Sequence, residues 1–296
     1  MMNGSEPRHI PVLLEEVITW LEPSPGMTIV DGTLGGGGHA AVLARRVSPG
    51  GRLIALDRDA AAIARAEHRL KGLPILLAQR DYRDLAELLK QLEIDRVDAV
   101  LLDLGLSSDQ LSDSRRGFSF DCEGPLDLRF DVSEGEPAWR LLDRLSAESL
   151  ANILYRYGEE RFSRRIARKV VETRKKKPIR TAAELARIVR SCVPHSRDRS
   201  RIDPATRTFQ ALRIAVNDEL GALETALRQV PDLLAPHGRM AVISFHSLED
   251  RLVKHAFRDN PKYEVLTKKP VRPTDAETAR NPRARSAKMR VAARRA

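Results

Sequence analysis

The chain has 296 residues, of which 42% are hydrophobic and 31% are charged. This composition supplies enough apolar sequence for a sizeable core and excludes an intrinsically disordered protein. No apolar run approaches the roughly 18 residues that a membrane span needs, the first residues lack the apolar core of a signal peptide, and Cys122 and Cys192 are too few for a disulfide framework. We therefore expect a soluble, cytoplasmic protein of one large or two modest domains.

Charge is distributed unevenly along the chain. The net charge is +10, yet residues 156–201 carry +11 and residues 268–296 carry +8, so the remainder carries −9. An acidic body with two strongly basic segments is typical of proteins that bind a polyanion such as nucleic acid. The same charges would also suit solvated helix faces and a disordered tail, so composition alone leaves both interpretations open.

Strand and helix patterns alternate in the first hundred residues. Short apolar runs predict strands, and the stretches between them predict helices, with Asp84 as the N-cap of the last helix. The expected strands are 27–31, 52–57, 74–79 and 97–105, and the expected helices are 39–47, 60–70 and 85–92. This rhythm predicts an α/β fold with a doubly wound, mostly parallel, Rossmann-like sheet.

The alternation stops between about residues 112 and 216, where the sequence predicts turns and basic helices but no strand. The expected helices there are 147–155, 160–175 and 182–193. Alternation then resumes with a helix at 208–227, a strand at 239–244, a helix at 248–257, and short strands at 263–267 and 288–292 that could close the sheet. We predict a discontinuous α/β domain over 1–111 and 217–296, interrupted by an inserted helical domain over 112–216.

A glycine-rich turn follows the first expected strand, in IVDGTLGGGGHAA (29–41). Glycine allows a tight turn and a close approach of backbone N–H groups to a ligand at a helix N-terminus. The segment Gly35-x-Gly37-x-x-Ala40, with Asp57 twenty residues past Gly37, also fits the dinucleotide fingerprint. A nicotinamide-dependent oxidoreductase is therefore an alternative that the glycines alone leave open.

The acids at the strand ends favour a different ligand. Asp31, Asp57 and Asp103 end the first, second and fourth expected strands, and Asp81 follows the third. A pyrophosphate would be repelled there, whereas S-adenosylmethionine carries a sulfonium, an ammonium and a ribose diol but no phosphate. We expect Asp57 to accept both ribose hydroxyls, the loop amides to receive the methionine carboxylate, and Asp103 to lie near the ammonium.

Eight blocks spread in order across the chain resemble the family of ribosomal RNA small subunit methyltransferase H. The blocks are HIPVLLEEV (9–17), DGTLGGGGHA (31–40), LDLGLSSDQL (102–111), RRGFSF (115–120) with GPLDLR (124–129), YGEERFSRRIAR (157–168), PATRTFQALRIAVN (204–217), SFHSLEDR (244–251) and NPRARS (281–286). The resemblance implies a class I S-adenosylmethionine-dependent methyltransferase core with a helical insert that recognises RNA. It also implies that the substrate is the N4 amine of a cytosine in the decoding region of 16S rRNA, in the small ribosomal subunit.

The resemblance also assigns a donor site residue by residue. It implies that S-adenosylmethionine is bound by Gly37, Gly38, His39, Asp57, Tyr82, Asp103 and Gln110. Tyr82 stands where relatives often have Phe, and either ring could flank the adenine. Ala40 replaces a frequent Ser, which removes one hydrogen bond without removing the loop.

The residue that orients the target amine is not assigned by the sequence. The exocyclic amine of cytosine is a poor nucleophile, so the enzyme needs a polar acceptor that holds an N–H and aims the nitrogen. Amino-methyltransferases of DNA use a Pro-Pro-aromatic motif after the fourth strand, which is absent here, and Asp103 and Ser107 are candidates by location. Phe118 or Phe120 could stack on the base, or both could be core anchors of the insert.

Several further features carry no catalytic prediction. The segment SFHSLED (244–250) lacks a nucleophile elbow, so we expect a structural or substrate-facing role. His9, His39 and His246 lack metal-ligand spacing, so no zinc site is predicted. A non-catalytic ribosome-assembly factor that binds RNA is a third candidate function, and the sequence does not distinguish a monomer from a homodimer.

Overall fold

A computed structural model of the protein describes residues 10–120, 123–194 and 203–296. His9 and Cys122, about which the sequence made predictions, lie outside the described residues. The chain divides into two compact units, one formed by Met1–Leu106 with Leu220–Ala296 and the other by Ser107–Glu219. No helix in the described ranges is both long enough and apolar enough to cross a membrane.

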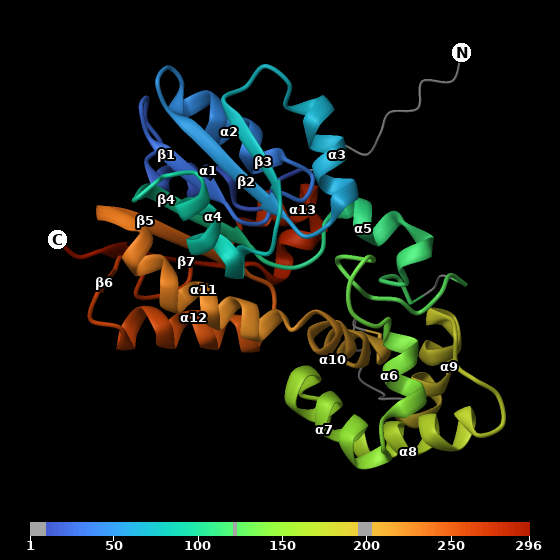
Figure 1. The fold of residues 1–296 in the computed structure, drawn as a ribbon. Coiled ribbons are helices and arrows are strands. Elements are labelled where there is room, and N and C mark those ends of the chain that lie inside the picture. Colours follow the sequence, from blue (N-terminus) through green and yellow to red (C-terminus); the bar gives the residue numbers. More distant parts are fainter. Residues whose placement is uncertain (1–9, 121–122, 195–202) are drawn as a thin grey trace. The chain divides into compact units, whose positions relative to one another are not determined.

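A seven-stranded sheet forms the centre of the first unit, with the strand order β3-β2-β1-β4-β5-β7-β6 (Figure 1). Strands β1 to β5 run parallel, and β7 is antiparallel to both β5 and β6. The strands are β1 Thr28–Asp31, β2 Arg52–Asp57, β3 Ile75–Gln79, β4 Val97–Asp103, β5 Leu234–Ser244, β6 Tyr263–Val265 and β7 Lys288–Arg294. The predicted doubly wound, mostly parallel α/β fold is thus confirmed.

Helices pack on both faces of this sheet. They are α1 Leu14–Leu21, α2 Gly38–Val47, α3 Ala60–Arg69, α4 Leu85–Gln91, α11 Glu219–Leu233, α12 Ser247–Asp259 and α13 Asp275–Arg280, with the 3-10 helices η1 Tyr82–Asp84 and η3 Pro282–Ser286. Neighbouring residues of β4 point to opposite faces of the sheet. Leu101 packs with the hydrophobic cluster around α1 and α2, and Leu102 packs with the cluster around α4, α11 and α12. Burial on both faces explains why β4 is almost entirely apolar.

Three details of the first unit differ from the sequence prediction. Asp84 makes no side-chain cap hydrogen bond to α4. The 3-10 helix η1 comes directly before α4, and Asp81 caps η1. The helix expected over 208–227 is two helices, broken at Asp218, whose φ is 50°. The strand expected over 288–292 is present as β7 but is longer, Lys288–Arg294, and it lies inside the sheet with β6 outside it.

The second unit is helical. Its helices are α5 Ser108–Ser112, α6 Ala138–Arg144, α7 Ala147–Gly158, α8 Ser163–Arg174, α9 Ala182–Cys192 and α10 Ala205–Asn217, with the 3-10 helix η2 Ser114–Arg116. The insert expected over 112–216 falls within this unit, and α6 was not predicted. Each of α7, α8, α9 and α10 contributes fully or nearly fully buried apolar side chains, among them Leu154, Ile166, Leu185 and Leu212.

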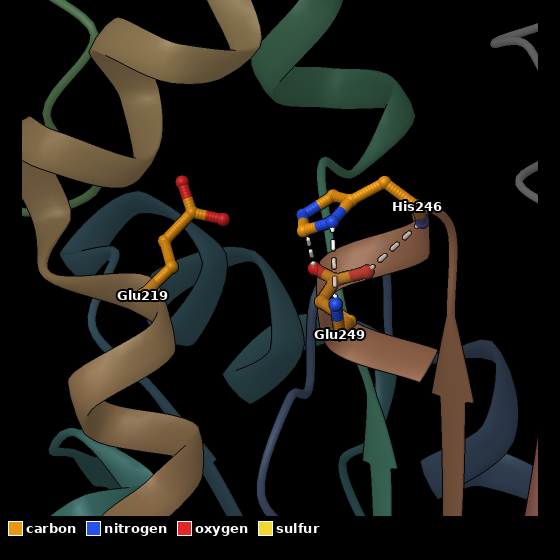
Figure 2. Close-up of side chains that lie close together, drawn as sticks. All are labelled: Glu219, His246 and Glu249. Carbon is orange, nitrogen blue, oxygen red and sulfur yellow. Dashed lines mark hydrogen bonds and ion pairs between the residues drawn. The ribbon is translucent and has the colours of Figure 1, made fainter. Parts of the chain in front are cut away.

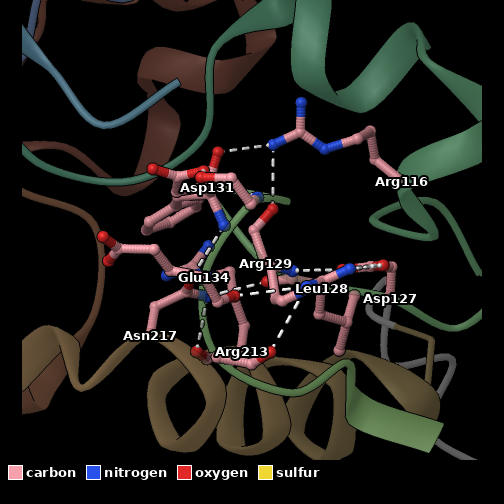
Figure 3. A network of polar contacts seen from close by, with 11 residues as sticks. Arg116, Asp127, Leu128, Arg129, Asp131, Glu134, Arg213 and Asn217 are labelled. Atoms are coloured by element: carbon pink, nitrogen blue, oxygen red, sulfur yellow. Dashed lines mark hydrogen bonds and ion pairs between the residues drawn. The ribbon is translucent and has the colours of Figure 1, made fainter. Parts of the chain in front are cut away.

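An irregular segment of the second unit, residues 127–135, is held by side-chain hydrogen bonds to its backbone (Figure 3). The Asn217 Oδ1 accepts the Phe130 N–H at 2.7 Å, and its Nδ2 donates to the Leu128 carbonyl at 2.7 Å. Arg116 donates to the carbonyls of Arg129 and Phe130 at 2.8 and 2.7 Å. These contacts supply the backbone partners that a helix or strand would otherwise provide.

The Asn217→Ala substitution should therefore lower the free energy of unfolding of the second unit by about 2–3 kcal/mol, because it leaves buried backbone groups without partners. Hydrogen exchange followed by mass spectrometry should show faster exchange for the amides of 126–139, with the strands β1 to β4 unchanged. Asn152→Ala, at an exposed position of α7, is the matched control. Equal exchange in the two variants would show that Asn217 does not hold this segment.

Candidate functional site

Three carboxyl groups end neighbouring strands of the parallel sheet. Asp31 is the last residue of β1, Asp57 of β2 and Asp103 of β4. Parallel strands bring these residues to the same edge, where open α/β sheets bind their ligands. Asp31 is 1% exposed, whereas the Asp103 side chain keeps 16% of its surface exposed.

The glycine-rich loop after β1 is anchored on Asp57. The Asp57 Oδ2 accepts the Gly35 N–H at 2.8 Å, and its Oδ1 accepts the Asp59 N–H at 2.9 Å. Gly35 and Gly37 have φ values of 49° and 73°, which favour glycine. The Gly37 N–H donates to the Leu34 carbonyl at 2.7 Å. The amides that can face a ligand are therefore those of the first turn of α2, which begins at Gly38 and whose N–H groups have no acceptor within the helix.

Thr33 links two of the acids, a role that the sequence did not reveal. Its hydroxyl lies 3.5 Å from Asp31 Oδ1, and its N–H donates to the same oxygen at 3.1 Å. The Thr33 Oγ1 in turn accepts the Asp103 N–H at 2.6 Å. One side chain thus fixes the end of β1 against the end of β4.

His39, in the first turn of α2, joins the glycine loop to Asp103. Its Nε2 lies 2.9 Å from the Val12 carbonyl and its Nδ1 lies 3.5 Å from Asp103 Oδ2. A carbonyl only accepts, so Nε2 carries a hydrogen, and Nδ1 faces the carboxyl group. His39 is therefore a buried side chain whose two ring nitrogens are both oriented by the protein.

Residues 10–13 form a short strap against this site, and the strap is held from the other end of the chain. Pro11 packs so close to Gly38 that a Cβ there would lie 3.1 Å from its ring. The Leu13 N–H donates to Glu277 of α13 at 2.7 Å, and Asn281 donates to the Ile10 carbonyl at 3.1 Å. A sequence block at 9–17 marked this region, but its contact with α13 could not be read from the sequence.

The electrostatics of the edge disfavour three negative charges at once. Burial raises the pKa of Asp31 to about 7, with a smaller contribution from Asp57. Burial likewise raises the pKa of Asp57 to about 6, although the Asp59 and Gly35 N–H groups oppose this. Burial, followed by the charges of Asp31 and Glu249, raises the pKa of Asp103 well above its usual range. In the ligand-free protein, protonated Asp31 and Asp57 stabilise the native state below about pH 4, and this contribution is lost as the pH rises through about 6 and 7.

The other predicted site residues lie in different elements of the two units. Tyr82 begins η1, and its Cβ lies next to Gly32 of the loop. Asp81 contacts Arg58 at 3.4 Å and Arg83 at 2.9 Å, so its carboxylate has cationic partners within the unit. Ser107 and Gln110 belong to the second unit, where they form the capping box of α5.

His246 and Glu249 have a structural role, which agrees with one of the two roles expected for 244–250. Figure 2 shows the His246 ring against the Glu249 carboxylate, with Nε2 3.0 Å from Oε1. Glu249 Oε2 also accepts the N–H groups of Phe245 and His246 at 2.8 and 3.2 Å, which caps α12.

Phe118 is a core anchor of the second unit, which was one of the two alternatives for it. Its side chain is 5% exposed and its ring centroid lies 5.8 Å from that of Phe130. Phe120 is half-buried, 5.7 Å from the ring of Phe209.

The sheet order with one antiparallel strand, the glycine loop after β1 and the acid that ends β2 together define a class I S-adenosylmethionine-dependent methyltransferase. The residues present suit that donor, because carboxyl groups whose pKa values are raised by burial would be stabilised in their charged form by a sulfonium and an ammonium.

Comparison with known proteins gives the family. The MraW methylase family profile matches residues 6–295, and the chain belongs to this family. It is 50% identical to ribosomal RNA small subunit methyltransferase H of Rhodopirellula baltica, over 99% of this chain and 93% of that protein. It is 48% identical to the protein of the same name from Trichlorobacter lovleyi, over 96% of this chain and 97% of that protein. Among solved structures, an S-adenosylmethionine-dependent O-methyltransferase from Thermotoga maritima aligns with a TM-score of 0.46 and 14% identity, over 100% of this chain and 69% of that one. The nicotinamide-dependent alternative is wrong, since the chain is a member of a methylase family.

The raised pKa values predict that donor binding depends on pH. Binding of a cation should release the protons held by Asp31 and Asp57, so affinity for S-adenosylmethionine should rise between about pH 5 and 7.5, by up to about tenfold per pH unit for each proton released. Isothermal titration calorimetry in two buffers of different ionisation enthalpy would measure the protons directly. S-adenosylhomocysteine, which lacks the sulfonium charge, should show a weaker dependence. A donor Kd that is flat across this range would contradict the assignment of these acids to the donor site.

Proposed function

We propose that this enzyme transfers a methyl group from S-adenosylmethionine to the N4 amine of a cytosine in the decoding region of 16S rRNA. The observation that carries the proposal is the near full-length identity of about half with relatives named ribosomal RNA small subunit methyltransferase H. The acid-lined sheet edge supports it, because that edge suits the cationic donor.

The donor would be held by groups with complementary charge. Asp57 would accept the ribose hydroxyls with the lone pairs that its two N–H donors leave available. The first-turn amides of α2, from Gly38 onward, would receive the carboxylate, and Asp31 and Asp103 would face the positive groups. Tyr82 would flank the adenine, and Gly37 and His39 would shape the loop. Gln110 is a further donor contact that the resemblance implies.

Asp103 is the residue that we assign to the target amine, ahead of Ser107. Its Oδ1 is buried and has no hydrogen-bond partner among the described residues, while Oδ2 faces His39. When bound, the donor supplies an electrophilic methyl group. Ionised Asp103 would hold an N–H of the amine through Oδ1, orient the nitrogen and take the proton that the nitrogen loses as its bond to carbon forms.

The test is to map the methylated nucleotide of 16S rRNA by mass spectrometry in cells with and without this protein. Loss of one N4-methyl mark on deletion, its return with the wild-type chain and its absence with Asp103→Asn would support the proposal. A mark that persists on deletion would refute it. A third outcome would identify a non-catalytic assembly factor. In that case no strain carries the methyl mark, the deletion impairs subunit assembly, and the Asp103→Asn variant restores assembly in full.

A further inference from the structure

We propose that α8, with the turns on either side of it, forms the surface on which the helical unit holds single-stranded rRNA, and that Tyr155 stacks on one of its bases. This inference rests on the proposed function, and it identifies the part of the insert that meets the substrate.

The first observation is a cluster of cations without acidic partners. Seven other cations of the second unit form ion pairs, namely Arg115, Arg129, Arg144, Lys177, Arg180, Arg190 and Arg213. Within the described residues no acid pairs with the eight exposed cations around α8, namely Arg156, Arg161, Arg164, Arg165, Arg168, Lys169, Lys175 and Lys176. Positive charge left unbalanced at one place on a surface attracts polyanions. We call these eight residues the α8 basic cluster.

The helix itself explains why the charges gather on one side. Residues Ser163, Ile166, Ala167 and Val170 are buried at the spacing of one helix face. Arg164, Arg165, Arg168 and Lys169 therefore occupy the opposite face, as two pairs at i and i+4. The helix of twelve residues is about 18 Å long, and Arg161 before it and Lys175 and Lys176 after it extend the basic surface, with Glu172 as the one acid of the helix.

The second observation is an exposed aromatic ring on the neighbouring helix. Tyr155 is 65% exposed, the largest fraction among the exposed large hydrophobic residues of the described chain. It lies in α7, which packs against α8 (Figure 1). Between the two helices, Arg161 stacks over Phe162 at 4.8 Å from the ring centroid. An exposed ring on one helix and cations on the helix packed against it supply the two kinds of contact, base stacking and phosphate binding, that proteins use for single-stranded RNA.

This combination favours RNA over another polyanion. An acidic protein or an anionic lipid surface would also be attracted by the positive charges. Neither has a base that could stack on the exposed Tyr155 ring. Arg174 and Lys177, which flank Lys175 and Lys176, are poorer candidates for an RNA contact. Arg174 donates to the Leu142 carbonyl and Lys177 pairs with Glu184 at 2.8 Å, so both side chains support the unit itself.

The experiment compares two variants of equal charge. In the first, Arg164, Arg165, Arg168 and Lys169 are all changed to Gln. In the control, the exposed residues Arg45, Arg46, Lys71 and Lys90 of the first unit are changed to Gln. Unmethylated small subunits are the substrate, and the readouts are the KM for subunits, the slope of log affinity against log salt for 16S rRNA, and the donor Kd.

We expect the α8 variant to raise the KM at least tenfold and to flatten the salt slope by up to about 3, since each single-strand phosphate contact contributes about 0.7. The control should change both by much less, and the donor Kd should stay constant in both. Tyr155→Ser should weaken RNA binding about tenfold at every salt concentration, and Tyr155→Phe should restore it.

The outcomes separate this inference from the function on which it rests. If the wild-type chain methylates subunits while the α8 variant keeps the wild-type KM and salt slope, the inference is wrong and the proposed function stands. Equal losses in the α8 variant and in the control would also overturn it, because they would show an effect of net charge alone. A wild-type chain that does not methylate small-subunit rRNA would refute the proposed function itself.

Discussion

Replacing Asp57 with alanine should weaken binding of S-adenosylmethionine by about 10- to 150-fold, equivalent to roughly 1.5–3 kcal/mol for hydrogen bonds to a charged group. The loss should have two sources. The ribose hydroxyls lose their charged acceptor. The Gly35 N–H loses the Asp57 carboxylate oxygen, 2.8 Å away, whose hydrogen bond holds the glycine loop. Calorimetric titration of the purified variant with donor measures the combined effect.

Asp57→Asn separates these two sources. The amide keeps the shape of the side chain and one acceptor oxygen but carries an NH2 group where the other N–H donor points. Its donor Kd should therefore fall between those of wild type and Asp57→Ala. Thermal unfolding of each variant controls for the fold, and a wild-type donor Kd in a folded Asp57→Ala variant would remove Asp57 from the site.

A chain that ends at Ala287 should fail to fold its first unit, because the whole of β7 would be lost. That strand pairs with β5 on one side and β6 on the other, and it buries Met289, Val291 and Ala292. The lost burial is worth about 5 kcal/mol or more, which is comparable to the total stability of a domain. Circular dichroism and solubility of the purified chain measure the outcome.

The charge of the same region can be tested without removing the strand. Arg283 and Arg285 are exposed in η3, so changing both to Gln should leave the unfolding temperature close to that of wild type. When the salt dependence of 16S rRNA binding is measured on the double variant as well, the experiments distinguish a structural from an RNA-binding role for this basic segment. A folded chain ending at Ala287 would show that β7 is dispensable.

The sequence predicted the first four strands closely because each is a short apolar run with both faces buried. β7 was predicted only as the shorter strand 288–292, and its interior position was hidden by its basic composition. Arg290 is buried at 7% exposure only because Asp250 of α12 lies 2.7 Å from its Nε, and such a partner is invisible in the local sequence. The break between α10 and α11 was missed for a related reason. Helical periodicity continues through Asp218, and only its left-handed conformation separates the two helices.

The candidate site, too, could be predicted from the sequence only in part. Strand-end acids and a glycine loop can be recognised one by one, since a parallel sheet brings the ends of its strands together. The contacts that orient them cross long stretches of chain, as when Glu277 holds Leu13 or Thr33 holds Asp103. Local periodicity carries no information about such pairs, so the supporting residues emerged only from the structure.

The insertion of the helical unit between β4 and β5 has a consequence for synthesis of the protein. These strands are neighbours in the sheet, yet all of residues 107–219 must be made after β4 and before β5. A nascent chain therefore presents β4 as an apolar edge strand with unpaired N–H and C=O groups, the kind of edge that promotes aggregation. Folding of the sheet must lag behind translation, and the half-made sheet is the stage at which this chain most needs protection by chaperones.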